Sequence, residues 1–326
     1  MSELSSTKLL TWLSLCAMLI TVQAAAACCR LILSYGGWLV PVYRERVADD
    51  IYVFISGLYA QVTAGVIVTT EGIVVVDTLP FPQESRELHN FAERLRPGGV
   101  RYIVITHYHA DHVNGLYLFS PAKAICHKRC REMLLKVGRS GLEEAKKHTP
   151  ALAEVELAIP EIVFDDTMTL HLGDKTIMAI HAPGHSSDLA MVYVKEPKVL
   201  FTSDVMMPVP YIVGGDPESL AESLRMIREM PLESIVQGHG EVLLRGEINE
   251  AIDSNLKYLQ TIQNLVREHV RAGHTRQALT RWDIESCGKS RIPLGGLVQQ
   301  LHLANLFYLY DRYRSEMVRQ PRDVAA

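Results

Sequence analysis

The chain has 326 residues, of which 48% are hydrophobic and 21% are charged, and its formal net charge is −4 at pH 7. These values exclude an intrinsically disordered protein, and the mild acidity gives no electrostatic case for a nucleic-acid partner. The length suits one large domain or a domain with an appendage.

The N-terminus carries an apolar run at residues 9–22, preceded by Lys8 and followed by alanines at 24–27. A cation, an apolar run and small residues form the pattern of an export signal, and an uncleaved membrane anchor is the alternative. We therefore expect residues 1–40 to be a signal peptide or membrane anchor with a linker. The protein is then exported (periplasmic or secreted) or anchored. Because Glu3 weakens the positive start, a cytoplasmic protein is the other option.

Residues 41–245 form the predicted main domain, and its first half is rich in strands. Runs of β-branched residues bounded by turn residues indicate strands. One segment, residues 83–95, predicts a helix because its apolar residues recur on one face. The predicted strands of this half lie at residues 51–55, 65–70, 73–76 and 103–105.

The second half of the domain continues this mixture, and the chain then becomes helical. Gly173-Asp174 is a hairpin-type turn dipeptide between two strand-like runs. From residue 247 apolar residues recur with helical spacing, so we expect residues 246–326 to be a helical extension packed on the main domain. Further strands are predicted at 122–126, 168–172, 176–182, 189–194, 199–202 and 234–237, helices at 128–136, 217–230 and 293–317, and a helix or loop at 143–156.

The strand at 103–105 leads directly into a cluster of potential metal ligands: His107, His109, Asp111 and His112. Side chains two apart on an extended chain point the same way, so His107 and His109 face one side together. Neutral imidazoles and carboxylates suit zinc, iron or manganese. Four such residues at a strand end predict a metal site.

Three further ligand candidates follow later predicted strands. His185 lies in a Pro-Gly-His turn, Asp204 follows the strand at 199–202, and His239 stands between two glycines. Ligands delivered from separate strand ends are held by a rigid sheet, while the surrounding loops stay free to vary with substrate. The sequence therefore predicts one metal constellation built from several strand ends.

The His-x-His-x-Asp-His pattern, followed in this order by the three later candidates, resembles the signature of the metallo-β-lactamase fold superfamily of hydrolases. The resemblance implies an α+β fold, an αββα sandwich of two mixed β-sheets flanked by helices, and a centre with two divalent metal ions. The implied ligands are His107, His109 and His185 for one ion and Asp111, His112 and His239 for the other, with Asp204 bridging them.

Residues around these ligands narrow the resemblance. A bridging aspartate such as Asp204 is typical of the thioesterase, lactonase and phosphodiesterase branches, whereas true zinc β-lactamases lack it. From about residue 47 to the end, the chain is similar to the quinoprotein-relay-type zinc metallohydrolases and the glyoxalase II-like branch. Two departures are Ser203, where glycine usually precedes the bridging aspartate, and Gln237, where proline usually precedes Gly-His-Gly. Asp77 resembles the superfamily's acidic residue after an early strand, which orients the ligands.

The implied activity is that of a binuclear metal-dependent hydrolase acting on a small molecule. Two bound cations, most simply Zn²⁺ with iron or manganese as alternatives, lower the pKa of a bridging water, and the hydroxide attacks a thioester, lactone or related ester. Asp111 would anchor one ion, orient the nucleophile and shuttle a proton. The same site permits a β-lactam hydrolase, a phosphodiesterase or a redox di-iron protein, whereas a non-catalytic module would be expected to lose a ligand.

Other residues have two interpretations. Tyr117, Met206, Met207 and Tyr211 follow metal-binding loops and are either walls of a substrate pocket or ordinary core residues. His302 with Asn305 either packs a helix against the floor of the site or joins two helices, and we favour the second. His181 is expected to face away from the metals. Surface positions are expected for His89, His127, His148, His171, His269 and His274.

Overall fold

The computed structural model describes residues 42–95 and 99–319. The predicted signal or anchor segment, residues 1–40, lies outside these ranges. None of the helices in the described part of the chain is long and apolar enough to cross a bilayer.

The first of two sheets is built from the N-terminal part of the described chain. The strands from β1 to β4 pair antiparallel, and those from β4 to β7 pair parallel. Parallel neighbours end at the same edge of a sheet, so the segments after β4 and β5 lie side by side. In spatial order the strands are β1 (Val42–Ala48), β2 (Ile51–Ser56), β3 (Thr63–Thr69), β4 (Gly72–Val76), β5 (Val100–Ile105), β6 (Lys123–His127) and β7 (Ile162–Phe164).

The second sheet is also mixed, because β11 and β12 run parallel while its other pairs are antiparallel. The hairpin predicted across Gly173-Asp174 is confirmed, with Leu172 opposite Lys175. In spatial order the strands are β13 (Val242–Leu244), β12 (Ser234–Gln237), β11 (Val199–Ser203), β10 (Ala190–Val194), β9 (Lys175–His181) and β8 (Thr167–Leu172).

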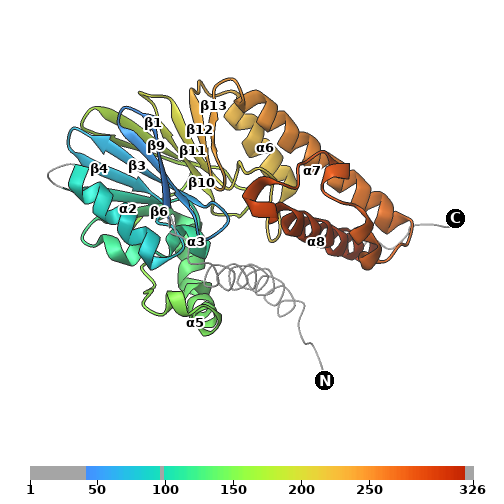
Figure 1. Ribbon diagram of the computed structural model, residues 1–326. Coiled ribbons are helices and arrows are strands. Elements are labelled where there is room, and N and C mark those ends of the chain that lie inside the picture. The colour runs from blue at the N-terminus through green and yellow to red at the C-terminus, as the bar shows by residue number, and fades with distance from the viewer. Residues whose placement is uncertain (1–41, 96–98, 320–326) are drawn as a thin grey trace, which may run out of the picture.

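The two sheets face each other across a buried apolar core, and helices cover their outer faces (Figure 1). Alternate residues of one strand serve different layers: Val104 of β5 contributes to the core between the sheets, whereas Ile103 and Ile105 pack towards the helices. Full burial of such a side chain contributes roughly 1.5–3 kcal/mol. The predicted α+β fold, an αββα sandwich, is confirmed.

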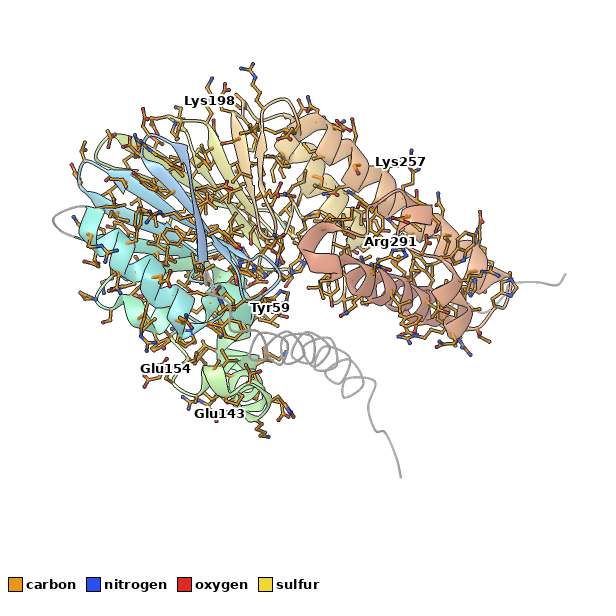
Figure 2. All side chains as sticks on the ribbon, viewed as in Figure 1. Tyr59, Glu143, Glu154, Lys198, Lys257 and Arg291 are labelled. Atoms are coloured by element: carbon orange, nitrogen blue, oxygen red, sulfur yellow. The ribbon has the colours of Figure 1, made fainter. Side chains whose placement is uncertain are left out.

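The helices divide between the two outer faces. The first sheet is covered by α2, α3 and α4, and the second by α6, α7 and α8, which share one hydrophobic cluster with it. Charged side chains such as Glu143, Lys198 and Lys257 project from the exterior (Figure 2). The helices are α2 (Pro82–Leu95), α3 (Ala110–Val113), α4 (Lys128–Met133), α5 (Arg139–His148), α6 (Pro217–Arg228), α7 (Ile248–Arg271) and α8 (Val298–Arg319), with short turns η1 (Leu116–Phe119), η2 (Leu134–Gly138), η3 (Pro150–Leu152), η4 (Arg276–Arg281), η5 (Glu285–Cys287) and η6 (Pro293–Gly296).

Three short or charged strands were not predicted: β1, β7 and β13. In β1 the residues from Tyr43 to Arg46 are exposed, and three of them are charged, because β1 is an edge strand whose side chains meet water. The predicted helix 128–136 is divided into α4 and the π-helical turn η2. Of these unpredicted strands, β13 begins three residues after the ligand candidate His239 and pairs with β12, the strand before it.

Candidate metal centre

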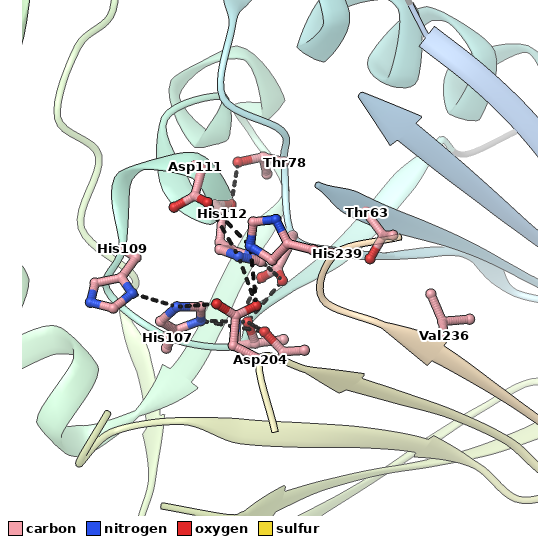
Figure 3. A network of polar contacts seen from close by, with 12 residues as sticks. Thr63, Thr78, His107, His109, Asp111, His112, Asp204, Val236 and His239 are labelled. Carbon is pink, nitrogen blue, oxygen red and sulfur yellow. Dashed lines mark hydrogen bonds and ion pairs between the residues drawn. The ribbon is translucent and has the colours of Figure 1, made fainter. Parts of the chain in front are cut away.

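The predicted ligands gather at one edge of the sandwich, next to the ends of the strands that precede them (Figure 3). Each side chain therefore lies in a loop or a short helix that follows a strand of the sandwich. His107 and His109 follow β5, Asp111 and His112 lie in α3, His185 lies between β9 and β10, Asp204 follows β11, and His239 follows β12.

The donor atoms form two groups, and within each group they lie within 4.8 Å of one another. The first group comprises His107, His109, His185 and Asp204, and the second comprises Asp111, His112 and His239. Both groups are able to hold a metal ion.

Asp204 stands between the two groups. Its Oδ2 is 3.2 Å from His185 Nε2 and 3.9 Å from His107 Nε2. Its Oδ1 is 3.3 Å from His112 Nε2 and 3.5 Å from His239 Nε2. One carboxylate thus presents one oxygen to each group, which is the arrangement of a bridging ligand.

The three imidazoles of the first group point their nitrogens at one another. His109 Nδ1 is 2.9 Å from both His107 Nε2 and His185 Nε2. Burial and the neighbouring histidines hold the pKa of His107 well below its usual value, and burial lowers the pKa of His109 to about 3. The rings of His107 and His109 are therefore neutral at physiological pH, the form that binds a cation.

The histidines of the second group lie beside more carboxylates than those of the first group. Burial opposes the charged form of His112, but the carboxylates of Asp111, Asp204 and Asp77 outweigh it and raise the pKa of His112 well above its usual value. Asp204 likewise outweighs the burial of His239 and raises its pKa. A positive charge is thus favoured between these carboxylates.

The outer nitrogens of the histidines are held by the protein. His185 Nδ1 donates to the backbone oxygen of Tyr211 at 2.9 Å, and His239 Nδ1 donates to that of Ala60 at 3.0 Å. His112 Nδ1 donates to the Asp77 carboxylate at 2.8 Å. Because Nδ1 carries the proton in each case, Nε2 is left to face the centre, as ligating histidines require.

Asp77 also organises the strand end that carries His107. Its carboxylate accepts the backbone N–H and the hydroxyl of Thr106, each at 2.8 Å. The Thr106 hydroxyl lies 2.8 Å from Ser203 Oγ and 3.2 Å from His107 Nδ1. Asp77 therefore contacts His112 directly and His107 through a buried hydroxyl pair.

The glycine before His239 permits a close approach of two loops. A Cβ atom on Gly238 would lie 2.0 Å from Asp204 Oδ1, so no other residue fits while Asp204 keeps its place.

The residues proposed as pocket walls lie in different surroundings. Met206 and Met207 are buried in the core beside α7, where Asn255 donates to Met206 Sδ and to the Met207 carbonyl, which favours the core interpretation for both. Tyr117 packs near Phe81 and lines a surface hollow beside the start of β6. Tyr211 is half-buried, with its ring centroid 5.9 Å from that of His185, so it borders the centre.

Two of the histidines predicted on the surface are buried. His127 stacks against His181 at a ring-centroid distance of 4.0 Å. His269 is enclosed between α7 and the segment that follows it, and its Nε2–H donates to the Thr275 carbonyl at 2.9 Å. The surface prediction is wrong for these two, because His127 packs against His181 and Phe164, and His269 packs against His274 and Tyr310. His302 joins Tyr258 and Trp282, as the structural interpretation expects.

The side chains fit a pair of divalent cations. His112 Nε2 and Asp204 Oδ1 are both buried, and neither completes a hydrogen bond within the described residues. A buried polar atom without a partner costs about 1–3 kcal/mol, which a bound cation would offset. The donors are imidazole nitrogens and carboxylate oxygens, a set that zinc, iron and manganese accept.

The family model described as "Metallo-beta-lactamase superfamily" matches residues 59–239, which include every ligand candidate. The chain belongs to the metallo-beta-lactamase superfamily. The matched residues include the two groups of side chains that could each hold a metal ion.

The chain is similar to part of several curated relatives. It is 26% identical to "Beta-lactamase-like protein 2 homolog" of Caenorhabditis elegans, covering 52% of this chain and 53% of that protein. It is 27% identical to the human "Acyl-coenzyme A thioesterase MBLAC2", a match that covers 42% of this chain and 54% of that protein. It is 23% identical to "Atrochrysone carboxyl ACP thioesterase" of Aspergillus fumigatus, a match that covers 59% of this chain and 56% of that protein. The chain thus spans about half the length of the relatives it matches.

Solved structures share the fold. A metallo-beta-lactamase from Pontibacter korlensis has a TM-score of 0.54 and 17% identity, covering 67% of this chain and 99% of that one. The inverting sec-alkylsulfatase Pisa1 from Pseudomonas has a TM-score of 0.64 and 15% identity, covering 83% and 50%.

Sequence reasoning missed some residues of the centre. Thr106 and Ser203 each precede a predicted ligand, so their position in the chain was a usable signal. Asp188, which accepts the backbone N–H of Tyr108 at 2.8 Å, follows His185 closely. Glu84 gave no signal, because it acts on a loop 26–28 residues away in sequence.

Proposed function

We propose that this superfamily member is a binuclear metal-dependent hydrolase that cleaves an ester-type bond of a small molecule, with acyl thioesters as the first class to test. The observation that carries the proposal is the position of Asp204, one oxygen of which faces each donor group. Two relatives named as thioesterases support the choice of substrate class.

His107, His109 and His185 would hold one cation, Asp111, His112 and His239 the other, and Asp204 both. Bound there, Zn²⁺ or a similar cation would supply Lewis-acid polarisation of the acyl carbonyl and a water that is acidic near neutral pH. The donors themselves stay fixed, because the Nδ1 atoms of His112, His185 and His239 are held from outside.

Asp111 would move the proton. Its side chain keeps 21% exposure, whereas that of Asp204 keeps 4%, so Asp111 borders both the centre and the solvent side. Its carboxylate would accept a proton from the attacking water and pass it to the departing thiolate or alkoxide. Tyr108, whose ring centroid lies 4.6 Å from that of His109, and Tyr211 would limit the access of bulk water on the other side.

A substrate panel tests the proposal. The full chain, loaded with zinc, manganese or iron, would be assayed on acyl thioesters, lactones, phosphodiesters and β-lactams. We expect thioester or lactone turnover that Asp111→Ala lowers by a factor of about 100 or more, the usual effect of losing a positioned acid or base. Turnover confined to phosphodiesters or β-lactams would contradict the substrate class. Turnover retained by Asp111→Ala would contradict the mechanism.

A further inference from the structure

We propose that the C-terminal helix α8 is a working part of the metal centre, because Asn305 positions the ligand His185 through the loop at residues 208–216. This inference rests on the proposed binuclear function, since its readout is the affinity of the cation that His185 would hold. Asn305 is here a positioning residue, acting on the metal through two backbone groups and one imidazole.

The Asn305 side chain hydrogen-bonds to the loop on both sides of Tyr211. Its Nδ2 donates to the Pro210 carbonyl at 2.7 Å, and its Oδ1 accepts the backbone N–H of Ile212 at 3.0 Å. Asn305 is fully buried. A single amide thus bonds one backbone acceptor and one backbone donor, as a neighbouring strand would, in a segment that lies in neither sheet. Its Nδ2 also donates to the Tyr258 hydroxyl at 3.3 Å.

The backbone between those two contacts holds the ligand. The Tyr211 carbonyl accepts the Nδ1–H of His185 at 2.9 Å. Because the residues before and after Tyr211 are both fixed by Asn305, the direction of the Tyr211 carbonyl is fixed as well. The path from α8 to the His185 imidazole therefore consists of hydrogen bonds through one buried residue and one peptide unit.

A second set of contacts ties the same loop to α8 and to the His185 turn. Tyr308, one turn after Asn305, donates its hydroxyl to the Gly215 carbonyl at 2.7 Å. The backbone N–H of Asp216 donates to the Gly184 carbonyl at 2.7 Å, beside His185, and Arg312 pairs with the Asp216 carboxylate at 2.9 Å. The loop is thus held between the helix and the ligand turn. In Figure 1, α8 lies beside α7, beyond the second sheet.

His302 supplies a matched comparison within the same helix. It is also buried in α8, and its contacts are to Tyr258 and Trp282 within the C-terminal region. The Tyr258 hydroxyl also accepts from Asn305 Nδ2 at 3.3 Å, so His302 shares a partner with Asn305 but does not itself contact the loop. A generic loss of α8 packing should therefore follow from His302→Gln as well as from Asn305→Ala. An effect on the His185 cation should follow only from changes that reach the loop.

The test is a stepwise Zn²⁺ titration of the metal-free full chain against a chromophoric chelator, for wild type, Asn305→Ala, Tyr308→Phe and His302→Gln. We expect Asn305→Ala to weaken one of two binding steps roughly 10- to 100-fold, the usual effect of removing an outer partner of a ligating histidine. Tyr308→Phe, a milder change that should fold even if Asn305→Ala does not, should weaken the same step less. His302→Gln should leave both steps near the wild-type values.

Nitrogen-15 NMR of histidine-labelled protein adds a direct readout, because Asn305→Ala should shift the Nδ1–H signal of His185 while those of His112 and His239 stay in place. Wild-type affinities and signals in the Asn305 and Tyr308 variants would overturn the inference. Equal weakening of both steps, or the same weakening in His302→Gln, would also overturn it, since α8 would then act by stability alone. Fewer than two binding steps in the wild type would instead refute the binuclear function.

Discussion

Ser203 combines a strained backbone with a useful hydroxyl. Its φ of 46° lies in the left-handed region, which costs a residue with a Cβ about 1 kcal/mol relative to glycine. Its Oγ is 2.8 Å from the Thr106 hydroxyl and 3.4 Å from His107 Nδ1. In the resemblance noted above, glycine usually stands at this position. We interpret serine here as accepting a strained backbone in return for a second polar contact to the candidate ligand His107.

Two substitutions separate these effects. Ser203→Gly removes both the strain and the hydroxyl, whereas Ser203→Ala removes the hydroxyl alone. We expect the glycine variant to unfold with a free energy about 1 kcal/mol higher than the alanine variant in the metal-free state. Both variants should bind the cation of the first donor group, which contains His107, roughly 10-fold more weakly than wild type. Urea denaturation and chelator competition measure the two quantities, and equal stability of the two variants would rule out the strain.

At the scale of elements, Glu84 of α2 clasps the turn after β2. Its buried carboxylate accepts the Ser56 hydroxyl at 2.8 Å and the backbone N–H groups of Gly57 and Leu58 at 3.1 and 3.3 Å. The same turn continues to Ala60, whose carbonyl holds His239. Burial raises the pKa of Glu84 from 4.5 to about 7, although these hydrogen bonds oppose the rise.

This pKa predicts a stability that depends on pH. The folded state holds the Glu84 proton more tightly than the unfolded chain, so its contribution is complete below pH 4.5 and is lost as pH rises through 7. The loss amounts to about 3 kcal/mol at most. Urea denaturation of the metal-free protein across this range should show the decline in wild type and in the control Glu222→Gln, which changes an exposed glutamate of α6. It should be absent from Glu84→Gln; parallel curves for wild type and Glu84→Gln would contradict the assignment.

Local sequence pattern predicted some elements of this fold and not others. The ligand strands were predictable because Val104 and Ile105 belong to an apolar run that ends abruptly at polar residues, so the place of His107 follows from local pattern. The strand β1 was not, because its charged edge residues lack alternation. Glu84 was assigned no role in the centre, and for Asn305 a link between two helices was favoured over a place at the floor of the site. Their contacts to the turn after β2 and to the loop at residues 208–216 join segments 26–28 and 93–95 residues apart, and local periodicity carries no information about such pairs.

At the scale of the whole molecule, the candidate metal centre draws its side chains from both sheets. His107 follows a strand of the first sheet, and Asp204 and His239 follow strands of the second. A cation bound between them is present only in the folded state, so it should stabilise folding by about 2.7 kcal/mol at a free concentration of 100 times Kd. Removal by a chelator should therefore lower the thermal midpoint, and re-added Zn²⁺ should restore it in proportion to the logarithm of its concentration. A midpoint indifferent to chelator would show that the sheets hold together without the metal.

The central claim is that two cations act together in hydrolysis, and a titration of activity against metal content tests it most directly. Metal-free full chain would receive Zn²⁺ in fractions of an equivalent while acyl thioester turnover is followed. The bridging position of Asp204 predicts little activity up to one equivalent and a rise that is complete at two. Full activity at one equivalent, or none at two with both ions bound, would contradict it.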